Sequence, residues 1–112
     1  MREKIAVFGS ETWTDKDKIK REIGKYNHAR VFMGMNKGAE ALANEAVFEL
    51  GGDRQNIMVL SKRVKHILKK MKKTPFHSKR VYIFHSNFSP DKRCAKASRL
   101  AKKYGCLVYN FY

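Results

Sequence analysis

The stretch VFMGMNKGAEALANEAVFELGG, residues 31–52, decides the fold, because it joins a strand pattern to a helix pattern through a short glycine turn. Its first residues complete an apolar run over 29–33 that Gly34 ends, as expected of a buried parallel strand. Over 37–50 the apolar residues recur at helical spacing: Ala39, Leu42, Ala43, Ala46 and Leu50. This spacing predicts an amphipathic helix, which the glycine pair at 51–52 ends.

The same alternation runs through the rest of the chain. Short apolar runs predict further strands at 4–8, 56–60, 80–84 and 107–112. Apolar residues at helical spacing predict three more helices, one that begins after a Thr14 cap and ends near 26–27, and two over 62–73 and 91–104. This order predicts an α/β fold with one domain over 1–112, a Rossmann-like three-layer sandwich of about five mostly parallel strands with helices on both faces.

Length and composition limit the classes of protein that fit. The chain has 112 residues, of which 43% are hydrophobic and 12% aromatic, so a disordered basic tail is excluded. No apolar run reaches the roughly 18 residues that span a bilayer, and the first residues do not form a signal peptide. We therefore expect a cytoplasmic protein with no membrane partner. The two cysteines and four histidines do not have metal-ligand spacing, so no metal is expected either.

The positive charge is concentrated in the second half. Residues 1–61 hold 10 basic and 9 acidic residues, whereas residues 62–112 hold 15 basic residues and one acidic residue, Asp91. Such asymmetry favours a polyanion or an anionic ligand as the partner of that half over a merely solubilising surface. If the partner is a polyanion, DNA or RNA is the candidate. The candidate nucleic-acid-binding residues lie in the two basic helices: Lys62, Arg63, Lys65, Lys69, Lys70, Lys72, Lys73, Lys92, Lys96, Arg99 and Lys103.

Glycines follow the first two predicted strands at the edge where parallel sheets bind ligands. Gly9-Ser10 comes after the first strand, and Gly34 and Gly38 come after the second, each ahead of a helix. A glycine lets a phosphate approach the backbone, and the free N–H groups of a helix start attract it. These turns predict a phosphate cradle, and the alternative is that the glycines only make tight turns.

Two aromatic residues lie in the loops beside this cradle. Trp13 follows the first strand and Phe88 follows the fourth. Either ring could stack on a nucleotide base, and for Trp13 a cap over the edge of the core is an equal alternative. His85, at the end of the fourth strand, is better explained as a structural histidine.

Three segments resemble the YspA-like branch of the SLOG superfamily: IAVFGSETWTD (5–15), VFMGMNKGAEALANEAVFELG (31–51) and SPDKRCAKASRLAKKYGCLVY (89–109). The family's first motif, Gly-Ser-Arg-x-aromatic-x-Asp, is matched by Gly9, Ser10, Trp13 and Asp15, with Glu11 in place of Arg. Its second motif, Gly-Gly-Ala-x-Gly-Ala-Asp, is matched by Gly34, Gly38 and Ala39. Lys37 occupies its variable position, and Glu40 replaces its Asp.

The resemblance implies a Rossmann-like nucleotide-binding protein related to LOG-type phosphoribohydrolases and to the DNA-processing protein of natural transformation. The PGGxGTxxE signature of the LOG-type enzymes does not occur in this chain. Glu11 and Glu40 are the two carboxylates that could act as acid and base beside the cradle. Carboxylates in loops and at helix starts are more commonly solvated groups without a catalytic role.

Three functions follow in order of preference. The first is non-enzymatic binding of a phosphorylated nucleotide or nucleotide-derived ligand at the carboxyl ends of strands one, two and four. No cofactor is expected. The candidate ligand-binding residues are Gly9, Ser10, Glu11, Trp13, Gly34, Lys37, Gly38, Glu40, Ser86 and Phe88. The second is sequence-independent binding of DNA or RNA by the basic half. The third is a nucleotide phosphoribohydrolase-like enzyme. The short length also fits a minimal phage or mobile-element protein acting in host cytoplasm, and the sequence leaves the oligomeric state open.

Overall fold

The computed structural model describes residues 3–73, 79–86 and 91–112. Its centre is one sheet of five parallel strands: β1 (Lys4–Gly9), β2 (Arg30–Met33), β3 (Gln55–Met58), β4 (Lys79–Phe84) and β5 (Leu107–Phe111). The strand order across the sheet is β3-β2-β1-β4-β5, and every neighbouring pair is parallel. The predicted α/β class with a parallel sheet is confirmed.

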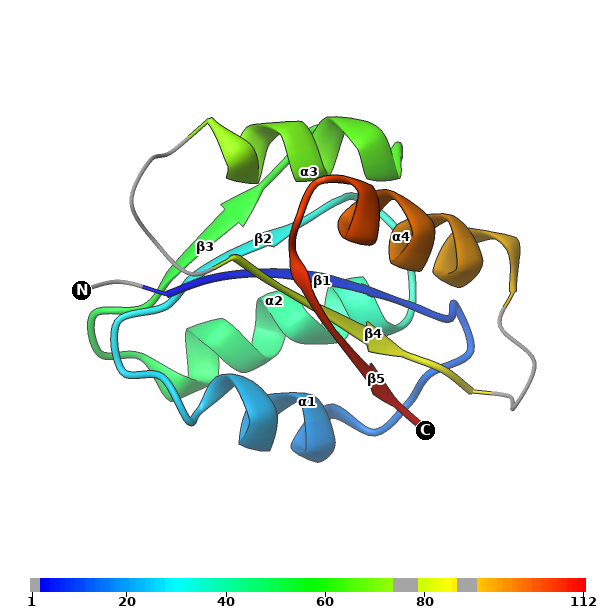
Figure 1. Cartoon of the computed structure of the whole chain (residues 1–112). Coiled ribbons are helices and arrows are strands. Elements are labelled where there is room, and N and C mark those ends of the chain that lie inside the picture. Colours follow the sequence, from blue (N-terminus) through cyan, green and yellow to red (C-terminus); the bar gives the residue numbers. More distant parts are fainter. Residues whose placement is uncertain (1–2, 74–78, 87–90) are drawn as a thin grey trace.

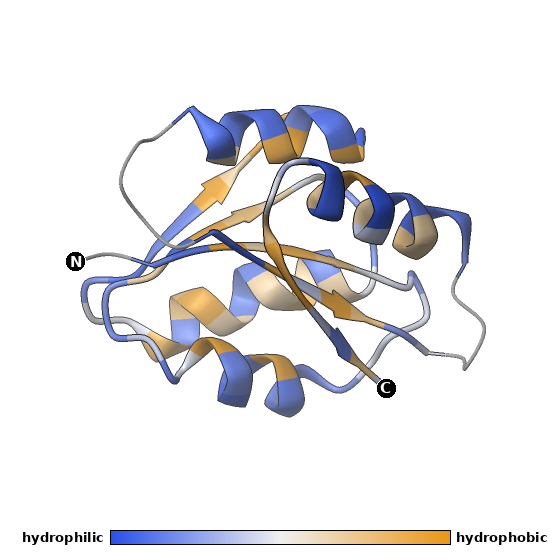
Figure 2. Cartoon of the chain, in the orientation of Figure 1, coloured by the Kyte–Doolittle hydropathy of each residue, from blue (hydrophilic) through white to orange (hydrophobic). Residues whose placement is uncertain are grey.

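Two helices cover each face of the sheet (Figure 1). Helices α1 (Lys16–Ile23) and α2 (Ala39–Leu50) pack on one face, and α3 (Val64–Lys72) and α4 (Lys92–Lys103) pack on the other. Each pair of helices encloses its own apolar core with the sheet between them. Figure 2 shows hydrophobic residues on the side of α3 that faces the sheet and hydrophilic residues on its outer side. This layering is the predicted three-layer sandwich.

Strand β1 lies at the centre of the sheet and is buried along its whole length. Its successive side chains alternate between the two cores, with Ile5 and Val7 on the α1/α2 side and Ala6 and Phe8 on the α3/α4 side. This explains why the sequence over 5–8 is continuously apolar rather than alternating. Strands β3 and β5 form the two edges.

Lysine 4, the first residue of β1, is also fully buried. Its Nζ donates to the carbonyl of Met71 at 3.1 Å, near the end of α3. Burial lowers the pKa of Lys4 below its ordinary value, and the nearby positive charges of Lys79 and Arg30 lower it further. The ammonium group thus satisfies a carbonyl in the last turn of α3, where a cation is favoured.

Several helix starts differ from the sequence predictions, and α2 begins at Ala39 rather than at 37. The cap of α1 is Asp15 rather than Thr14, because the Asp15 carboxylate accepts a hydrogen bond from the Lys18 backbone N–H at 3.1 Å. Helix α3 begins at Val64 rather than at 62. Its start is delayed because the Ser61 hydroxyl accepts from the Arg63 N–H at 3.0 Å, which holds these residues in a turn outside the helix.

None of the helices within the described ranges has both the length and the hydropathy needed to cross a bilayer.

Candidate functional site

The strand order places a switch point between β1 and β4. The chain leaves β1 toward β2 on one side and leaves β4 toward β5 on the other. In open parallel sheets, ligands bind at the carboxyl ends of the strands beside such a point. A pocket of about 420 Å³ lies there in this structure, with Gly9, Ser10, Glu11 and Thr12 on one wall and Asp91, Lys92 and Arg93 on the other. We refer to it as the switch-point pocket.

The two walls of the switch-point pocket are joined by a hydrogen bond. The Ser10 hydroxyl donates to Asp91 Oδ2 at 3.3 Å, while Asp91 Oδ1 accepts from the Cys94 N–H at 2.8 Å and so caps α4. Partial desolvation raises the pKa of Asp91, but the hydrogen bonds from Cys94 and Ser10 outweigh this effect and the net pKa is below its ordinary value. The pocket therefore carries both a carboxylate and the cations of Lys92 and Arg93.

Behind the pocket, Arg93 forms an ion pair with a fully buried carboxylate. Arg93 Nε lies 2.7 Å from Glu40 Oε2, and its Nη2 lies 2.8 Å from Oε1. The Gly34 N–H also donates to Oε1, at 3.2 Å. Arg93 Nη1 donates to the Lys62 carbonyl. One guanidinium group thus connects the start of α4, the start of α2 and the segment that leads into α3.

Arg93 is a residue that the sequence analysis missed, although a signal for it exists. Glu40, Ala43 and Val47 follow helical spacing, and all three are buried. A carboxylate on a buried stripe requires a hydrogen-bonded cation. What the sequence does not reveal is which of the many basic residues supplies it.

The glycines of the predicted cradle lie where two loops touch. A Cβ at Gly9 would lie 2.4 Å from the Ala39 Cβ, and one at Gly38 would lie 2.3 Å from the Ser10 carbonyl oxygen. That carbonyl also accepts from the Ala39 N–H, the first residue of α2, at 3.2 Å. A Cβ at Gly34 would lie 2.5 Å from Ile67 Cδ1. The loops after β1 and β2 are therefore in direct contact, and the open space lies toward α4.

The remaining cradle residues are divided between the two loops. Glu11 is exposed at the pocket, and the side-chain amide of Asn36, with its nitrogen toward Glu11, donates to it at 3.0 Å. Lys37 is exposed in the loop after β2 and does not line the switch-point pocket. Glu40 lies beneath the loops with Arg93. The structure thus brings Gly9, Ser10 and Glu11 to the pocket and places Gly34, Gly38 and Glu40 behind it.

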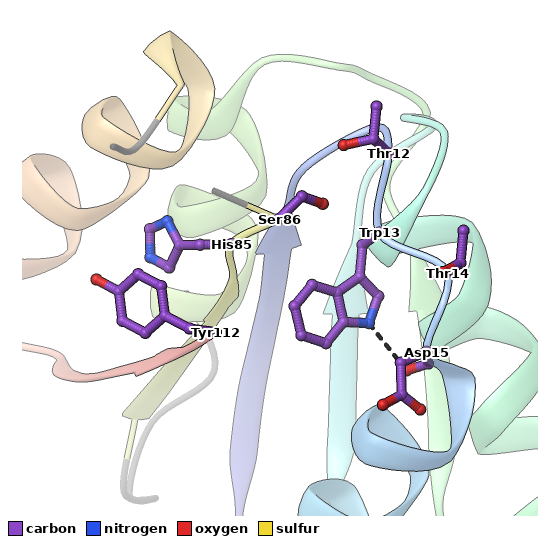
Figure 3. Close-up of a pocket in the computed structure, with 7 residues that line it drawn as sticks. All are labelled: Thr12, Trp13, Thr14, Asp15, His85, Ser86 and Tyr112. Carbon is purple, nitrogen blue, oxygen red and sulfur yellow. Dashed lines mark hydrogen bonds between the residues drawn. The ribbon is translucent and has the colours of Figure 1, made fainter. Parts of the chain in front are cut away.

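A second pocket, of about 270 Å³, contains the predicted Trp13 and Ser86 (Figure 3). The indole lies on one side, with His85 and Tyr112 on the other. Trp13 is buried, its N–H donates to the Asp15 carbonyl at 2.8 Å, and its ring centroid lies 5.3 Å from that of Phe84. In this position Trp13 covers the edge of the α1/α2 core. Phe88 lies outside the described residues.

His85 is buried and held in place by its neighbours. Its Nε2 lies 2.8 Å from Asn110 Oδ1, and its ring stacks on Tyr112 with the centroids 4.8 Å apart. Within the described ranges, no group of three or more His, Cys, Asp or Glu side chains is arranged to hold a metal ion.

The predicted nucleic-acid-binding residues gather on one side of the molecule. Helices α3 and α4 cover the same face of the sheet, and every basic residue named above for that role is exposed. We call this surface the basic face. Lys72 also contributes to packing, since its Nζ lies 5.0 Å from the centroid of the Tyr104 ring. Asp91, at the start of α4, is the one acidic residue in the second half of the chain.

Comparisons of this chain with protein-family models, with curated proteins and with solved structures found no match.

Proposed function

We propose that this protein binds the phosphate backbone of double-stranded nucleic acid, without sequence specificity, through its basic face. The observation that carries the proposal is that α3 and α4 lie side by side on one face of the sheet, where α3 presents lysines to solvent and α4 presents lysines and Arg99. A surface of this kind attracts a polyanion and releases the counterions bound to it. The acidic residues belong mainly to the first half of the chain, which forms the opposite face.

The composition of the basic face favours duplex over single strands. Single strands are commonly bound by exposed aromatic rings on which the bases stack. Neither Val64–Lys72 nor Lys92–Lys103 contains a Phe, Tyr or Trp. Lysines also outnumber arginines there, which suits contacts with phosphates better than bidentate recognition of guanine. The chain measures about 35 Å along its longest axis, so one copy spans at most about ten base pairs at 3.4 Å each.

The test measures duplex affinity by fluorescence anisotropy over a range of salt concentrations. The variant carries Lys65→Gln, Lys69→Gln and Lys73→Gln, which lie on one stripe of the α3 surface at i, i+4 and i+8. For duplex DNA, each lost phosphate contact lowers the slope of log affinity against log salt by about 0.9, so three lower it by about 2.7.

The matched control removes the same charge from the opposite face, with Lys20→Gln and Arg21→Gln on α1 and Lys25→Gln just after it. We expect its slope to equal that of the unmodified protein. An equal loss of slope in both variants would contradict the proposal, because it would mean that net charge rather than the basic face determines binding. Tighter binding of a single strand than of the duplex would contradict the choice of duplex.

A second candidate function is supported by the switch-point pocket. There we propose a nucleotide-derived ligand, whose phosphate would contact Lys92 and Arg93 and whose ribose hydroxyls would donate to Glu11 and Asp91. The supporting observation is that these groups of both signs meet in one pocket beside the switch point. A nucleotide that binds there raises the melting temperature of the protein by mass action.

This second candidate is tested by thermal unfolding with mononucleotides, cyclic nucleotides and ADP-ribose at high salt. Ser10→Ala should reduce the rise in melting temperature, because it removes the hydrogen bond that Ser10 donates to Asp91, one of the proposed ligand contacts. Ser98→Ala, on α4 outside the pocket, should keep it. If none of these nucleotides stabilises the unmodified protein, the candidate is wrong.

A further inference from the structure

Strand β3 forms one edge of the sheet, and exposed apolar side chains lie close to its outer side. Within the described residues, β3 pairs with β2 alone. Phe48 on the adjoining α2 is 85% exposed, Leu60 is 84% exposed and Met58 is 39% exposed. Phe48 borders two shallow grooves between α2 and β3, and Asn56 lines both of them. Large apolar side chains gathered at one place on a surface mark an interaction site.

Within the part of the chain that the structure describes, no other strand pairs with the outer backbone groups of this edge. The N–H groups of Gln55 and Val59 donate to β2-side carbonyls, those of Ala29 and Met33. Because alternate residues of a parallel strand point their backbone groups to opposite sides, those of Asn56 and Met58 point outward. Ile57 and Val59 pack toward the α3/α4 core, so the side chains of Asn56 and Met58 lie on the α2 side, near Phe48.

Charge identifies the occupant of this edge. The chain carries a net charge of +15, so two copies repel each other over most of their surface. Residues 55–61, QNIMVLS, contain no charged residue. Natural edge strands are usually protected by lysine, proline or a bulge, and this basic chain places neither lysine nor proline there. An uncharged edge is what pairing with an identical copy requires, because a two-fold axis brings each residue near its own counterpart.

We infer that the protein forms a two-fold dimer in which the β3 strands of two copies pair antiparallel, joining two five-stranded sheets into one of ten strands. The axis passes beside Asn56, so that Asn56 lies opposite its own counterpart, as a two-fold antiparallel pair requires. Phe48 shares a groove with Asn56, so the two Phe48 rings meet across the axis and are buried together. The dimer contact thus combines backbone hydrogen bonds with an apolar cluster.

The opposite edge, at β5, is also uncharged, but its exposed rings already have partners. The Tyr109 ring lies 5.4 Å from that of Tyr82, and the Tyr112 ring stacks on His85. Lys18 donates to the Tyr112 carbonyl at 2.6 Å. Leu107 remains 53% exposed, which makes it the matched control for the β3 edge.

The dimer has a consequence for the basic face. A two-fold axis that relates antiparallel neighbours in one sheet is perpendicular to that sheet, so both copies present α3 and α4 on the same side. The two α3 helices approach each other, and their lysines repel. Salt screens this repulsion, so we expect the dimer to become tighter as salt rises.

The test is the molar mass from light scattering after size-exclusion chromatography, at about 10 and about 100 µM, concentrations that detect a Kd in the micromolar range. The unmodified protein should approach twice the chain mass of 13.0 kDa as concentration rises. Met58→Pro removes an outward N–H without removing a bond to β2, and Phe48→Lys places two like charges at the axis. Both variants should remain at the mass of one chain.

Phe48→Lys leaves the strand backbone unchanged, so it tests the proposal even if Met58→Pro does not fold. Leu107→Lys, at the β5 edge, should keep the mass of the unmodified protein. A single-chain mass at both concentrations would overturn the inference. So would a dimer that survives Phe48→Lys, or one that only Leu107→Lys separates.

Discussion

Arg93 is the residue on which the arrangement of the loops depends most. Its guanidinium group is the cation that compensates the fully buried Glu40 carboxylate. We expect Arg93→Met to lower the free energy of unfolding by about 3–5 kcal/mol, because it leaves a buried charge without its partner. Urea unfolding measures the loss. Combining Arg93→Met with Glu40→Gln should recover part of it, and an equal loss in both variants would show that the carboxylate is not the cause.

Position 38 requires glycine both for its backbone conformation and for the lack of space around it, and a pair of variants can distinguish the two effects. Its φ is +72°, and a Cβ would lie 2.3 Å from the Ser10 carbonyl oxygen. Gly105 has a similar φ of +75° with open space around it. Gly105→Ala should therefore cost about 1 kcal/mol from backbone strain alone, and Gly38→Ala should cost clearly more in the same urea experiment. Equal costs would mean that the loops after β1 and β2 separate easily.

The buried Lys4 predicts how stability changes in mildly alkaline solution. Because burial lowers its pKa in the folded state, the unfolded chain binds more protons between that lowered pKa and the ordinary value of 10.5. Unfolding free energy should therefore rise with pH in this window through the Lys4 contribution. Subtracting the pH profile of Lys4→Met from that of the unmodified protein isolates this contribution, and a difference that falls with pH would refute it.

At the level of elements, α4 depends on the cap at its first turn. Asp91→Ala should lower the unfolding free energy by about 1 kcal/mol, since the Cys94 N–H loses its acceptor.

Asp91→Asn keeps an acceptor but not the charge. The lowered pKa of Asp91 contributes stability above its ordinary value of 3.8, and this contribution is lost as pH falls below 3.8. Asp91→Asn should remove that part of the acid dependence while the helix remains capped. An unchanged acid profile would show that another carboxylate is responsible.

The elements themselves were largely predictable from the sequence. Continuous apolar runs and helical spacing locate all the strands and helices to within a few residues, because both patterns follow directly from burial. Helix starts were less accurate. Asp15 rather than Thr14 caps α1, and residues such as Thr14 and Asp15 both have the chemistry of a cap. The choice between them is made by packing, which the local sequence does not contain.

The sequence places the candidate residues at the carboxyl ends of the strands, where Gly9 and Ser10 line the switch-point pocket. It does not reveal which of these residues contact one another. The contact between the loops after β1 and β2 and the pairing of Glu40 with Arg93 join residues as far apart as 53 positions. Spacing along the chain does not reveal such pairs, because they depend on the order of strands in the sheet.

For the whole molecule, the imbalance of charge predicts a response to salt. The basic residues of α3 and α4 repel one another in the folded state, and the described structure offers few acidic groups on that face. We expect the melting temperature to rise between about 0.05 and 0.5 M salt as this repulsion is screened. The triple α3 variant Lys65→Gln, Lys69→Gln, Lys73→Gln should show a smaller rise than the triple α1 variant. An equal rise would place the repulsion elsewhere.

The position of β1 in the sheet also determines the order in which the chain can fold. Lys4 pairs with Arg30 on one side and with Lys79, 75 residues later, on the other. Contacts between residues so far apart slow folding, because a long loop must close before they form. During synthesis, the unit from β1 to β3 can assemble while the rest is still being made. Helix α3 can then pack on β1 and β2, whereas α4 contacts β1, β4 and β5 and joins only after β4 has left the ribosome. Until then, the part of the β1 face that α4 covers lies exposed.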